Sequence, residues 1–255
     1  MSGTNENYKI VGKGEKTIVF IHYFGGDAGS WHWLVERLKK NHTCVLLNLP
    51  GFGGTEALNE PSIYGFSKFI NDQITALKLE KYVLCGHSMG GKLALYAAKI
   101  MTGVKPKKII LVAPSPPTVE NMSEPDKERM LNHPNKEEAI NTVNKVIVRK
   151  LSKKRFKYAV ASQLRIEDKT WDWWILTGMK NNIADRIQQL DIPVHVIFSH
   201  GDEVITTEAI YDEVLPHLDK AVAISISRVG HLIPMEAPRK LAKRIKKITK
   251  DLVAV

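Results

Sequence analysis

The first half of the chain alternates short, continuously apolar runs with segments whose apolar residues recur at helical spacing. An apolar run without polar alternation is typical of a strand buried on both faces, and helices between such runs allow the strands to pair in parallel. Right-handed crossovers then give a doubly wound, mostly parallel sheet of the α/β class. The strands that this pattern predicts are 8–11, 17–22, 43–49, 81–85 and 108–113, with helices at 31–38, 65–77 and 91–101.

The pattern stops after Ala113. The stretch 114–117 reads P-S-P-P, which neither continues a strand nor begins an ordinary helix. From there to Leu190 the chain is helical in character, and strand-like runs return only at 194–199 and 221–229. An interruption of about seventy residues is too long for a simple loop. We therefore expect an α/β core of residues 1–114 and 191–255, with residues 115–190 forming an inserted helical lid.

Composition excludes several classes of function. Of the 255 residues, 44% are hydrophobic and 25% are charged, which is ordinary for a soluble globular protein. No apolar run approaches the roughly 18 residues of a membrane helix. Residues 1–6 are polar and do not have the basic start and apolar middle of a signal peptide. We expect a cytoplasmic protein that does not bind membranes.

Metal and nucleic-acid binding are not favoured either. Cys44 and Cys85 lie in apolar runs, which predicts buried free thiols, and the histidines lack zinc-type pairing. The net charge of +10 is concentrated in 149–157 and 239–250. In the second segment apolar residues recur at helical spacing, which predicts an amphipathic helix with a solvated basic face. Since no recognisable nucleic-acid module is present, we expect no metal and no nucleic-acid partner.

A serine stands between glycines at the predicted junction of a strand and a helix. The stretch 85–91 reads C-G-H-S-M-G-G, which contains the pattern G-x-S-x-G around Ser88. Flanking glycines permit a sharp turn, and the helix that follows offers free N–H groups to a developing negative charge. The serine is either part of a structural turn or a displayed nucleophile, and its position between strand and helix favours the nucleophile.

A nucleophilic serine needs a base that takes its proton and an acid that orients the base. Asp202 follows the predicted strand 194–199, and His231 follows the predicted strand 221–229. The carboxyl ends of parallel strands meet at one edge of a sheet, so these side chains are expected to approach Ser88. The chain order Ser, Asp, His is also the order found for this triad on a parallel sheet. We predict Ser88, Asp202 and His231 as the catalytic residues.

With these motifs the chain resembles the α/β-hydrolase superfamily, in its branch of lidded serine carboxylesterases, over nearly its whole length. Further matching stretches are H-Y-F-G-G at 22–26, L-P-G-F-G-G-T at 49–55 and G-H-L-I-P-M-E-A-P at 230–238. The resemblance implies that Ser88 is the nucleophile, His231 the base and Asp202 the orienting acid. It also implies that the backbone N–H groups of Met89 and Phe24 form the oxyanion hole. Most relatives have glycine where Tyr23 stands, so this side chain is expected to narrow the pocket.

The resemblance and the nucleophile together predict a reaction. Enzymes of this fold that open epoxides or remove halides need a carboxylate at the position of Ser88, so acyl chemistry is favoured. We expect hydrolysis of small carboxylic esters through an acyl-enzyme, which needs no cofactor. Tyr23, Trp171 and Trp174 are the predicted pocket residues, although packing of the lid against the core would equally explain the two tryptophans.

Other functions remain compatible with the same triad. The basic segment 149–157 is a possible landing site for an acidic acyl carrier that presents the ester. Cleavage of carbon–carbon bonds or lactones and a cofactor-free peroxidase-type side activity use the same residues. A ligand sensor with an intact triad and slow turnover belongs to a different functional class, and fold and triad do not separate it from an enzyme.

Overall fold

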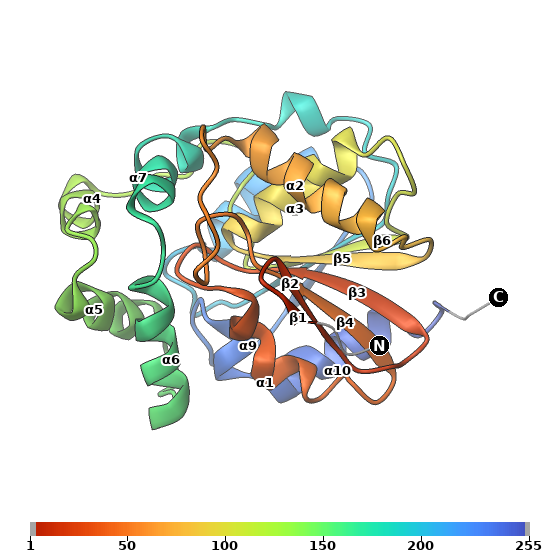
Figure 1. Ribbon diagram of the computed structural model, residues 1–255, viewed down its shortest axis with the longest axis horizontal. Helices are drawn as coiled ribbons and strands as arrows, with labels where there is room; N and C mark the ends of the chain where they lie inside the picture. Colours follow the sequence, from red (N-terminus) through yellow and green to blue (C-terminus); the bar gives the residue numbers. More distant parts are fainter. Residues whose placement is uncertain (1–3, 253–255) are drawn as a thin grey trace.

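A single sheet runs through the centre of the protein, whose residues 4–252 are described by the computed structural model (Figure 1). Its strands are β1 (Thr4–Asn5), β2 (Tyr8–Val11), β3 (Lys16–Ile21), β4 (His42–Leu47), β5 (Tyr82–His87), β6 (Lys108–Val112), β7 (Val194–Phe198) and β8 (Ala221–Ser225). They lie in the order β1-β2-β4-β3-β5-β6-β7-β8. Strands β3 to β8 form a parallel sheet, and β2 joins β4 antiparallel. The predicted α/β fold with a mostly parallel sheet is confirmed.

Helices cover both faces of this sheet and fill the interval between β6 and β7 (Figure 1). The helices are α1 (His32–Val35), α2 (Ile63–Ala76), α3 (Met89–Ile100), α4 (Glu124–Leu131), α5 (Lys136–Val146), α6 (Lys153–Gln163), α7 (Asp168–Leu176), α8 (Thr207–Ala209), α9 (Ile233–Glu236) and α10 (Pro238–Ile248). Short 3-10 segments lie at Ala28–Trp31, Gly178–Lys180, Asp185–Ile187 and Leu215–His217, and Ile210–Val214 forms a π-helical turn. Residues 1–3 and 253–255 lie outside the described residues. The predicted α/β core includes them, and residues 1–3 are the first half of the polar start.

Two apolar cores lie on opposite faces of the sheet because successive side chains of a strand point to opposite sides. In β3, Val19 and Ile21 face α2 and α3, whereas Ile18 and Phe20 face α1 and α10. All four side chains are completely buried. A strand covered on both faces must be apolar throughout, which explains the continuous runs in the sequence.

The basic C-terminal segment forms the predicted amphipathic helix. In α10, Leu241, Ile245 and Ile248 are buried in the second core, and the lysines and arginines between them are exposed. One of the two basic segments noted in the sequence, 239–250, therefore lies largely on a solvated helix face. Within residues 4–252 no helix is both long and apolar enough to cross a membrane.

Two predicted elements differ from the structure. The predicted helix 31–38 is divided into a 3-10 segment and the single turn α1. The last strand ends at Ser225 instead of residue 229, and Arg228 has a φ of 60°. There the chain leaves the sheet edge and turns toward the carboxyl ends of the strands, which brings His231 to them.

The segment between β6 and β7 carries α4 to α7, which lie together beyond one end of the sheet, at the left of Figure 1. Its two connections to the core are bonded to each other, since Glu120 donates its N–H to the carbonyl of Met179 (2.9 Å). Lys92 of α3 is completely buried and binds both connections. Its Nζ donates to the carbonyls of Thr118 (2.8 Å) and Met179 (3.2 Å). One buried cation from the core thus holds the entry and the exit of the inserted helices.

Candidate active site

Ser88 occupies a sharp turn between β5 and α3. Its φ is 52° and its ψ is −121°, a backbone conformation that non-glycine residues rarely adopt. The turn is held by the backbone, because Ser88 donates its N–H to the carbonyl of Val112 (3.0 Å) and accepts from the N–H of Ser115 (3.0 Å). Strain of this kind persists where the surrounding structure fixes it, and it is common at functional sites.

The glycines around Ser88 are required by close backbone contacts. A Cβ on Gly86 would lie 2.2 Å from the carbonyl oxygen of Gly90, and a Cβ on Gly90 would lie 2.5 Å from the carbonyl oxygen of Ile21. Neither contact can be relieved by a side-chain movement, since both partners are backbone atoms. The small residues therefore let the first turn of α3 pack directly against β3 and β5, which fixes the position of Ser88.

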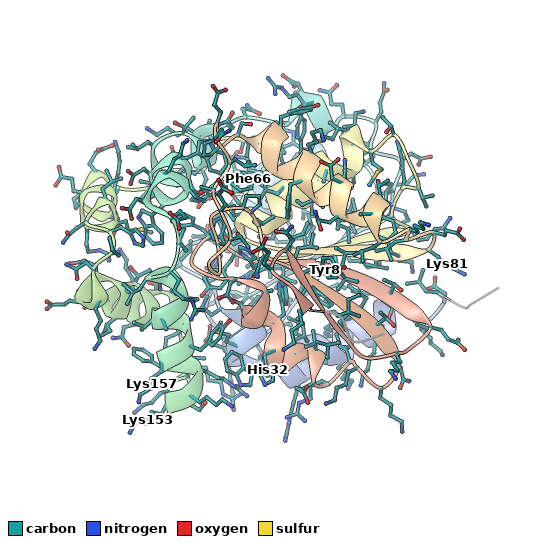
Figure 2. All side chains as sticks on the ribbon, viewed as in Figure 1. Tyr8, His32, Phe66, Lys81, Lys153 and Lys157 are labelled. Atoms are coloured by element: carbon teal, nitrogen blue, oxygen red, sulfur yellow. The ribbon has the colours of Figure 1, made fainter. Side chains whose placement is uncertain are left out.

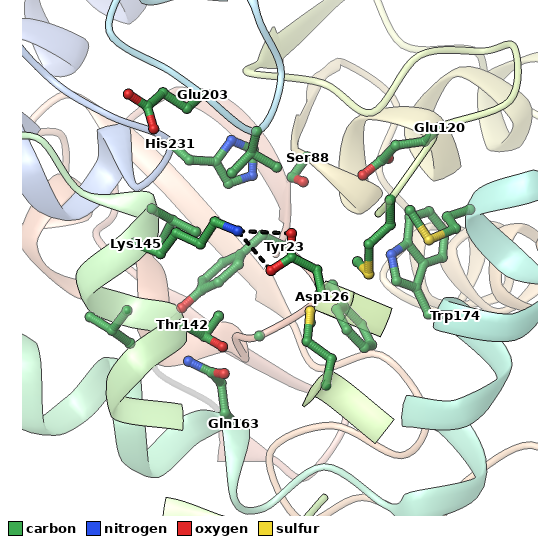
Figure 3. A pocket seen from close by; sticks show the side chains of 18 of the residues that line it. Tyr23, Ser88, Glu120, Asp126, Thr142, Lys145, Gln163, Trp174, Glu203 and His231 are labelled. Atoms are coloured by element: carbon green, nitrogen blue, oxygen red, sulfur yellow. Dashed lines mark hydrogen bonds and ion pairs between the residues drawn. The ribbon is translucent and has the colours of Figure 1, made fainter. Parts of the chain in front are cut away.

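The imidazole of His231 lies beside Ser88 in the wall of one cavity (Figure 3). Its Nδ1–H donates to Oδ2 of Asp202 at 2.8 Å. The second carboxylate oxygen of Asp202 accepts the N–H groups of Val204 (2.9 Å) and Ile205 (3.0 Å). These bonds fix the Asp202 side chain, and with it the orientation and the tautomer of His231, so that its Nε2 is free to act as a base.

Charges around His231 favour its protonated form. Burial lowers the pKa of His231, but the nearby carboxylates of Asp202, Glu120 and Glu236 outweigh it and raise the pKa above its ordinary value. A second histidine, His87, supports the loop by donating its Nε2–H to the carbonyl of His231 (2.9 Å). Burial holds the pKa of His87 well below its ordinary value, so it is a neutral structural group.

Two backbone N–H groups are of interest near Ser88: that of Phe24, which lines the cavity, and that of Met89, which follows Ser88 directly. Phe24 follows β3, and Met89 is the first residue of α3. Among the backbone hydrogen bonds of residues 4–252, neither N–H group has an acceptor. The N–H of Met89 also lies at the positive end of the α3 dipole. Both groups are thus available to an oxygen atom that develops negative charge.

The cavity next to Ser88 has a volume of about 230 Å³. Its apolar wall is formed by Phe24, Trp171 and Trp174, together with methionine side chains of the inserted segment. The ring of Phe24 lies 4.4 Å from that of Trp171, and both tryptophans are 3% exposed. The same tryptophan side chains line the cavity and pack the inserted helices against the core, and their role as substrate-pocket residues stays a prediction.

Tyr23 lines the cavity on the side of α5 and α6, where its ring lies near Thr142 and Gln163 (Figure 3). Its ring centre is 5.1 Å from that of His87, and its hydroxyl is buried without a hydrogen-bond partner in the described chain. Burial raises the pKa of this hydroxyl. The side chain thus forms part of the cavity wall, and its hydroxyl is turned away from Ser88 (Figure 3).

Charged residues that the sequence did not single out also face the cavity. Asp126 of α4 and Lys145 of α5 form an ion pair, in which Nζ of Lys145 lies 2.7 Å from Oδ1 of Asp126 (Figure 3). Glu120 lies on the other side of Ser88 from His231 (Figure 3). None of the three belongs to a recognisable motif, because their positions depend on how the inserted segment folds. No group of three or more histidine, cysteine, aspartate or glutamate side chains suited to a metal ion occurs within residues 4–252.

Comparisons with known proteins agree with this geometry. Residues 16–140 match the family model described as the alpha/beta hydrolase fold. The solved esterase of Exiguobacterium antarcticum superimposes with a TM-score of 0.86 at 14% identity, covering 98% of this chain and 100% of that one. The chain belongs to the α/β-hydrolase superfamily. The strand-to-helix turn at Ser88 lies within the residues that this family model matches.

Two relatives of this α/β-hydrolase are more similar in sequence. A Mycoplasma genitalium protein with a provisional esterase/lipase name is 28% identical over 235 residues, which cover 89% of this chain and 86% of the relative. The pimeloyl-[acyl-carrier protein] methyl ester esterase of Legionella pneumophila is 27% identical over 223 residues, which cover 84% of this chain and 87% of the relative. Both matches span the core and the inserted helices.

Proposed function

We propose that this α/β-hydrolase is a serine hydrolase that cleaves small carboxylic esters through an acyl-enzyme. Ester hydrolysis as the reaction class is supported by the family and by the names of the two relatives. The observation that carries the proposal is the meeting of three features at one cavity: the strained turn at Ser88, the oriented imidazole of His231 and its carboxylate partner Asp202.

In the first half-reaction, Ser88 Oγ attacks the ester carbonyl carbon while His231 Nε2 accepts its proton. Asp202 keeps the imidazolium oriented and stabilises its charge. The carbonyl oxygen becomes an oxyanion that accepts hydrogen bonds from the N–H groups of Phe24 and Met89, each worth about 2.7–4 kcal/mol of the barrier. His231 then gives the proton to the departing alcohol, which leaves an acyl group on Ser88.

In the second half-reaction a water molecule replaces the alcohol. His231 takes a proton from this water as it attacks the acyl-enzyme, and the same two N–H groups hold the second oxyanion. Proton return to Ser88 releases the carboxylic acid. Residues 115–190 act as the lid, since their tryptophans and methionines form the apolar wall around the acyl or alcohol group. We place this reaction in the cytoplasm.

A second candidate is an ester presented by an acidic acyl carrier. It is favoured by the name of the Legionella relative and by the exposed basic residues of 149–157. Figure 2 shows Lys153 and Lys157 at the outer end of α6, where a carrier protein can reach them. Electrostatic steering by such a surface makes turnover of the carrier-bound ester fall with added salt, while turnover of a small free ester does not.

The decisive experiment measures hydrolysis of p-nitrophenyl esters from acetate to decanoate by the wild type and by Ser88→Ala. The matched control is Ser152→Ala, because Ser152 is exposed and its side chain makes no capping hydrogen bond. Turnover in the wild type and in the control, with loss in Ser88→Ala, supports the proposal. Absence of Ser88-dependent turnover on every ester contradicts the proposal. The hypotheses to test next are then cleavage of carbon–carbon bonds or lactones, and ligand sensing.

A further inference from the structure

Glu120 presents a carboxyl group to the reaction centre. It lies on the connection that follows β6, lines the same cavity as Ser88 and His231, and points toward Ser88 (Figure 3). Ser115 donates its hydroxyl to Oε2 of Glu120. Because Ser115 also donates its N–H to the carbonyl of Ser88 (3.0 Å), the carboxyl group is fixed relative to the nucleophile.

The Glu120 carboxyl group does not form an ion pair that would explain its position as purely structural. The nearest buried cation, Lys92, directs its Nζ to the carbonyls of Thr118 and Met179. Among residues 4–252, no ion pair joins Lys92 to Glu120, and Oε1 of Glu120 has no hydrogen-bond donor. Burial lowers the pKa of Lys92 to about 8 and raises the pKa of Glu120, so burial disfavours the charged form of both groups. The charge of each favours the charged form of the other, but the two groups do not form a direct ion pair.

Part of the cavity wall is apolar. Met122, Trp174 and Met179 line it, and polar residues such as Asn121 and Ser123 interrupt this apolar wall. Glu120 is half-buried and lines the cavity, and its Oε1 accepts no hydrogen bond from the described chain, so a ligand group can donate a hydrogen bond there in a site that is partly shielded from water. A hydroxyl group can serve both forms of the side chain, as a donor to the carboxylate or as an acceptor from the acid. A carboxylate on the ligand would instead be repelled.

We propose that Glu120 determines specificity by binding a hydroxyl group that the substrate carries close to the scissile ester bond. The substrate class is therefore short hydroxy-esters, with the rest of the acyl or alcohol group against the tryptophan and methionine wall. This inference rests on the proposed function, because Ser88 must first act on the ester. It adds a residue and a substrate feature that the triad does not fix.

The test compares kcat/KM for methyl butyrate, methyl 2-hydroxybutyrate, methyl 3-hydroxybutyrate and monomethyl succinate, with acid release followed by titration. The proteins are the wild type, Glu120→Gln and Glu120→Met. Glu203→Gln is the matched control, since it removes an equal charge from an exposed residue that also lines the cavity. Circular dichroism and thermal unfolding verify that each variant is folded.

We expect the wild type to prefer one hydroxybutyrate over butyrate by about tenfold or more, which is the effect of one hydrogen bond to a charged group. The preference should fall in Glu120→Gln, vanish in Glu120→Met and persist in Glu203→Gln. Monomethyl succinate should be the poorest wild-type substrate and should improve in Glu120→Gln.

Different failures are distinguishable in this design. Equal wild-type turnover of butyrate and both hydroxybutyrates overturns the role of Glu120 and leaves the serine esterase intact. A preference that survives in Glu120→Met also overturns it, because another group then binds the hydroxyl. Absence of Ser88-dependent turnover on all four esters removes the proposed function, and this inference with it. The wild-type comparison alone decides the outcome if a variant does not fold.

Discussion

Arg165 donates a hydrogen bond of 2.7 Å to the carboxylate of Asp27, and this contact joins the inserted helical segment to the loop that carries Phe24. Tyr158 of α6 donates its hydroxyl to the other oxygen of the same carboxylate. Asp27 also caps the 3-10 segment after it by accepting the N–H of Gly29 (2.9 Å). A single buried carboxylate thus positions both the inserted helices and the loop of the predicted oxyanion hole.

Replacement of this carboxylate should affect stability and activity together. In Asp27→Asn the charge that holds Arg165 and Tyr158 is lost, so the free energy of unfolding should fall by about 1–3 kcal/mol. The value of kcat should fall as well, because the Phe24 loop is less well held. Urea unfolding and ester turnover measure the two effects. Asp72→Asn, which removes an exposed partner of Lys68, should change stability by at most about 1 kcal/mol. Equal effects of both substitutions would contradict this role of Asp27.

Asp202→Asn tests whether the carboxylate next to His231 orients the base. An amide presents an N–H group to Nδ1, which favours the wrong tautomer of His231 while the backbone bonds to the side chain are largely kept. We expect kcat to fall by about four orders of magnitude. Steady-state kinetics on the best ester, with circular dichroism as a fold control, provide the measurement. A loss smaller than about tenfold would mean that Asp202 is not the orienting acid.

The pH dependence of kcat/KM should report His231. Its imidazole must be neutral to accept a proton, so activity should rise with pH through a pKa above the ordinary histidine value. In Glu120→Gln a negative charge that stabilises the imidazolium is removed. The pKa of His231 then falls, and the rise in activity moves to lower pH. A pH profile from acidic to alkaline conditions shows the shift, and an unchanged profile in the variant would exclude Glu120 as a source of this charge.

Acid should destabilise the fold through His22. Its Nδ1–H donates to the carbonyl of Tyr23 (2.9 Å) and its Nε2 accepts the N–H of Leu49 (3.2 Å), which requires the neutral ring. Burial lowers the pKa of His22 from 6.5 to about 4. The unfolded chain therefore takes up this proton first, and stability is lost as pH falls from the unfolded pKa toward the folded one, by about 3 kcal/mol.

Urea unfolding at about pH 7 and about pH 4.5 measures this effect. His22→Gln should be less stable than the wild type at the higher pH, since it disturbs two buried hydrogen bonds. Its additional loss at the lower pH should be smaller, because the substituted side chain does not titrate. If both proteins lost the same stability on acidification, His22 would not be the group responsible.

A methyl group at the turn below Ser88 should not be tolerated. In Gly90→Ala the added Cβ meets the backbone carbonyls of His22 and Ile21 at 2.5 Å, so the free energy of unfolding should fall by about 1–3 kcal/mol or more. Gly103→Ala is the matched control, because its Cβ would meet only a methionine sulfur at 3.8 Å. Thermal unfolding of the two variants compares them. Similar melting temperatures would mean that the turn relaxes without cost.

The central strands were the most predictable part of the fold. The predicted strand 108–113 is β6 (Lys108–Val112), and the predicted strand 194–199 is β7 (Val194–Phe198). These strands are covered on both faces, so side chains on both faces must be apolar, and the sequence shows a continuous apolar run. The edge strand β8 is half exposed and lacks such a constraint, and its end at Ser225 depends on where the chain must turn toward the site.

The candidate site was predictable only where residues follow strands directly. Ser88, Asp202 and His231 stand just after β5, β7 and the last strand-like run, so topology alone brings them to one edge. Asp27 acquires its partners Tyr158 and Arg165 from packing of the inserted helices, and helical periodicity does not specify which loops such helices touch. Glu120 is oriented by Ser115 in an irregular connection, where no periodic pattern indicates which way a side chain points. Their positions therefore required the structure.

The bonds at the base of the inserted segment have an evolutionary consequence. Glu120 and Met179, and likewise Ile183 and Pro117, hold the outgoing and returning chain side by side, and Lys92 ties both to the core. These hydrogen bonds fix the distance between the two ends of the inserted segment, and this distance does not depend on the number or length of the helices between them. Such a segment is an exchangeable module: new helices can be grafted at this junction to present a different binding wall, while the nucleophile below keeps its place.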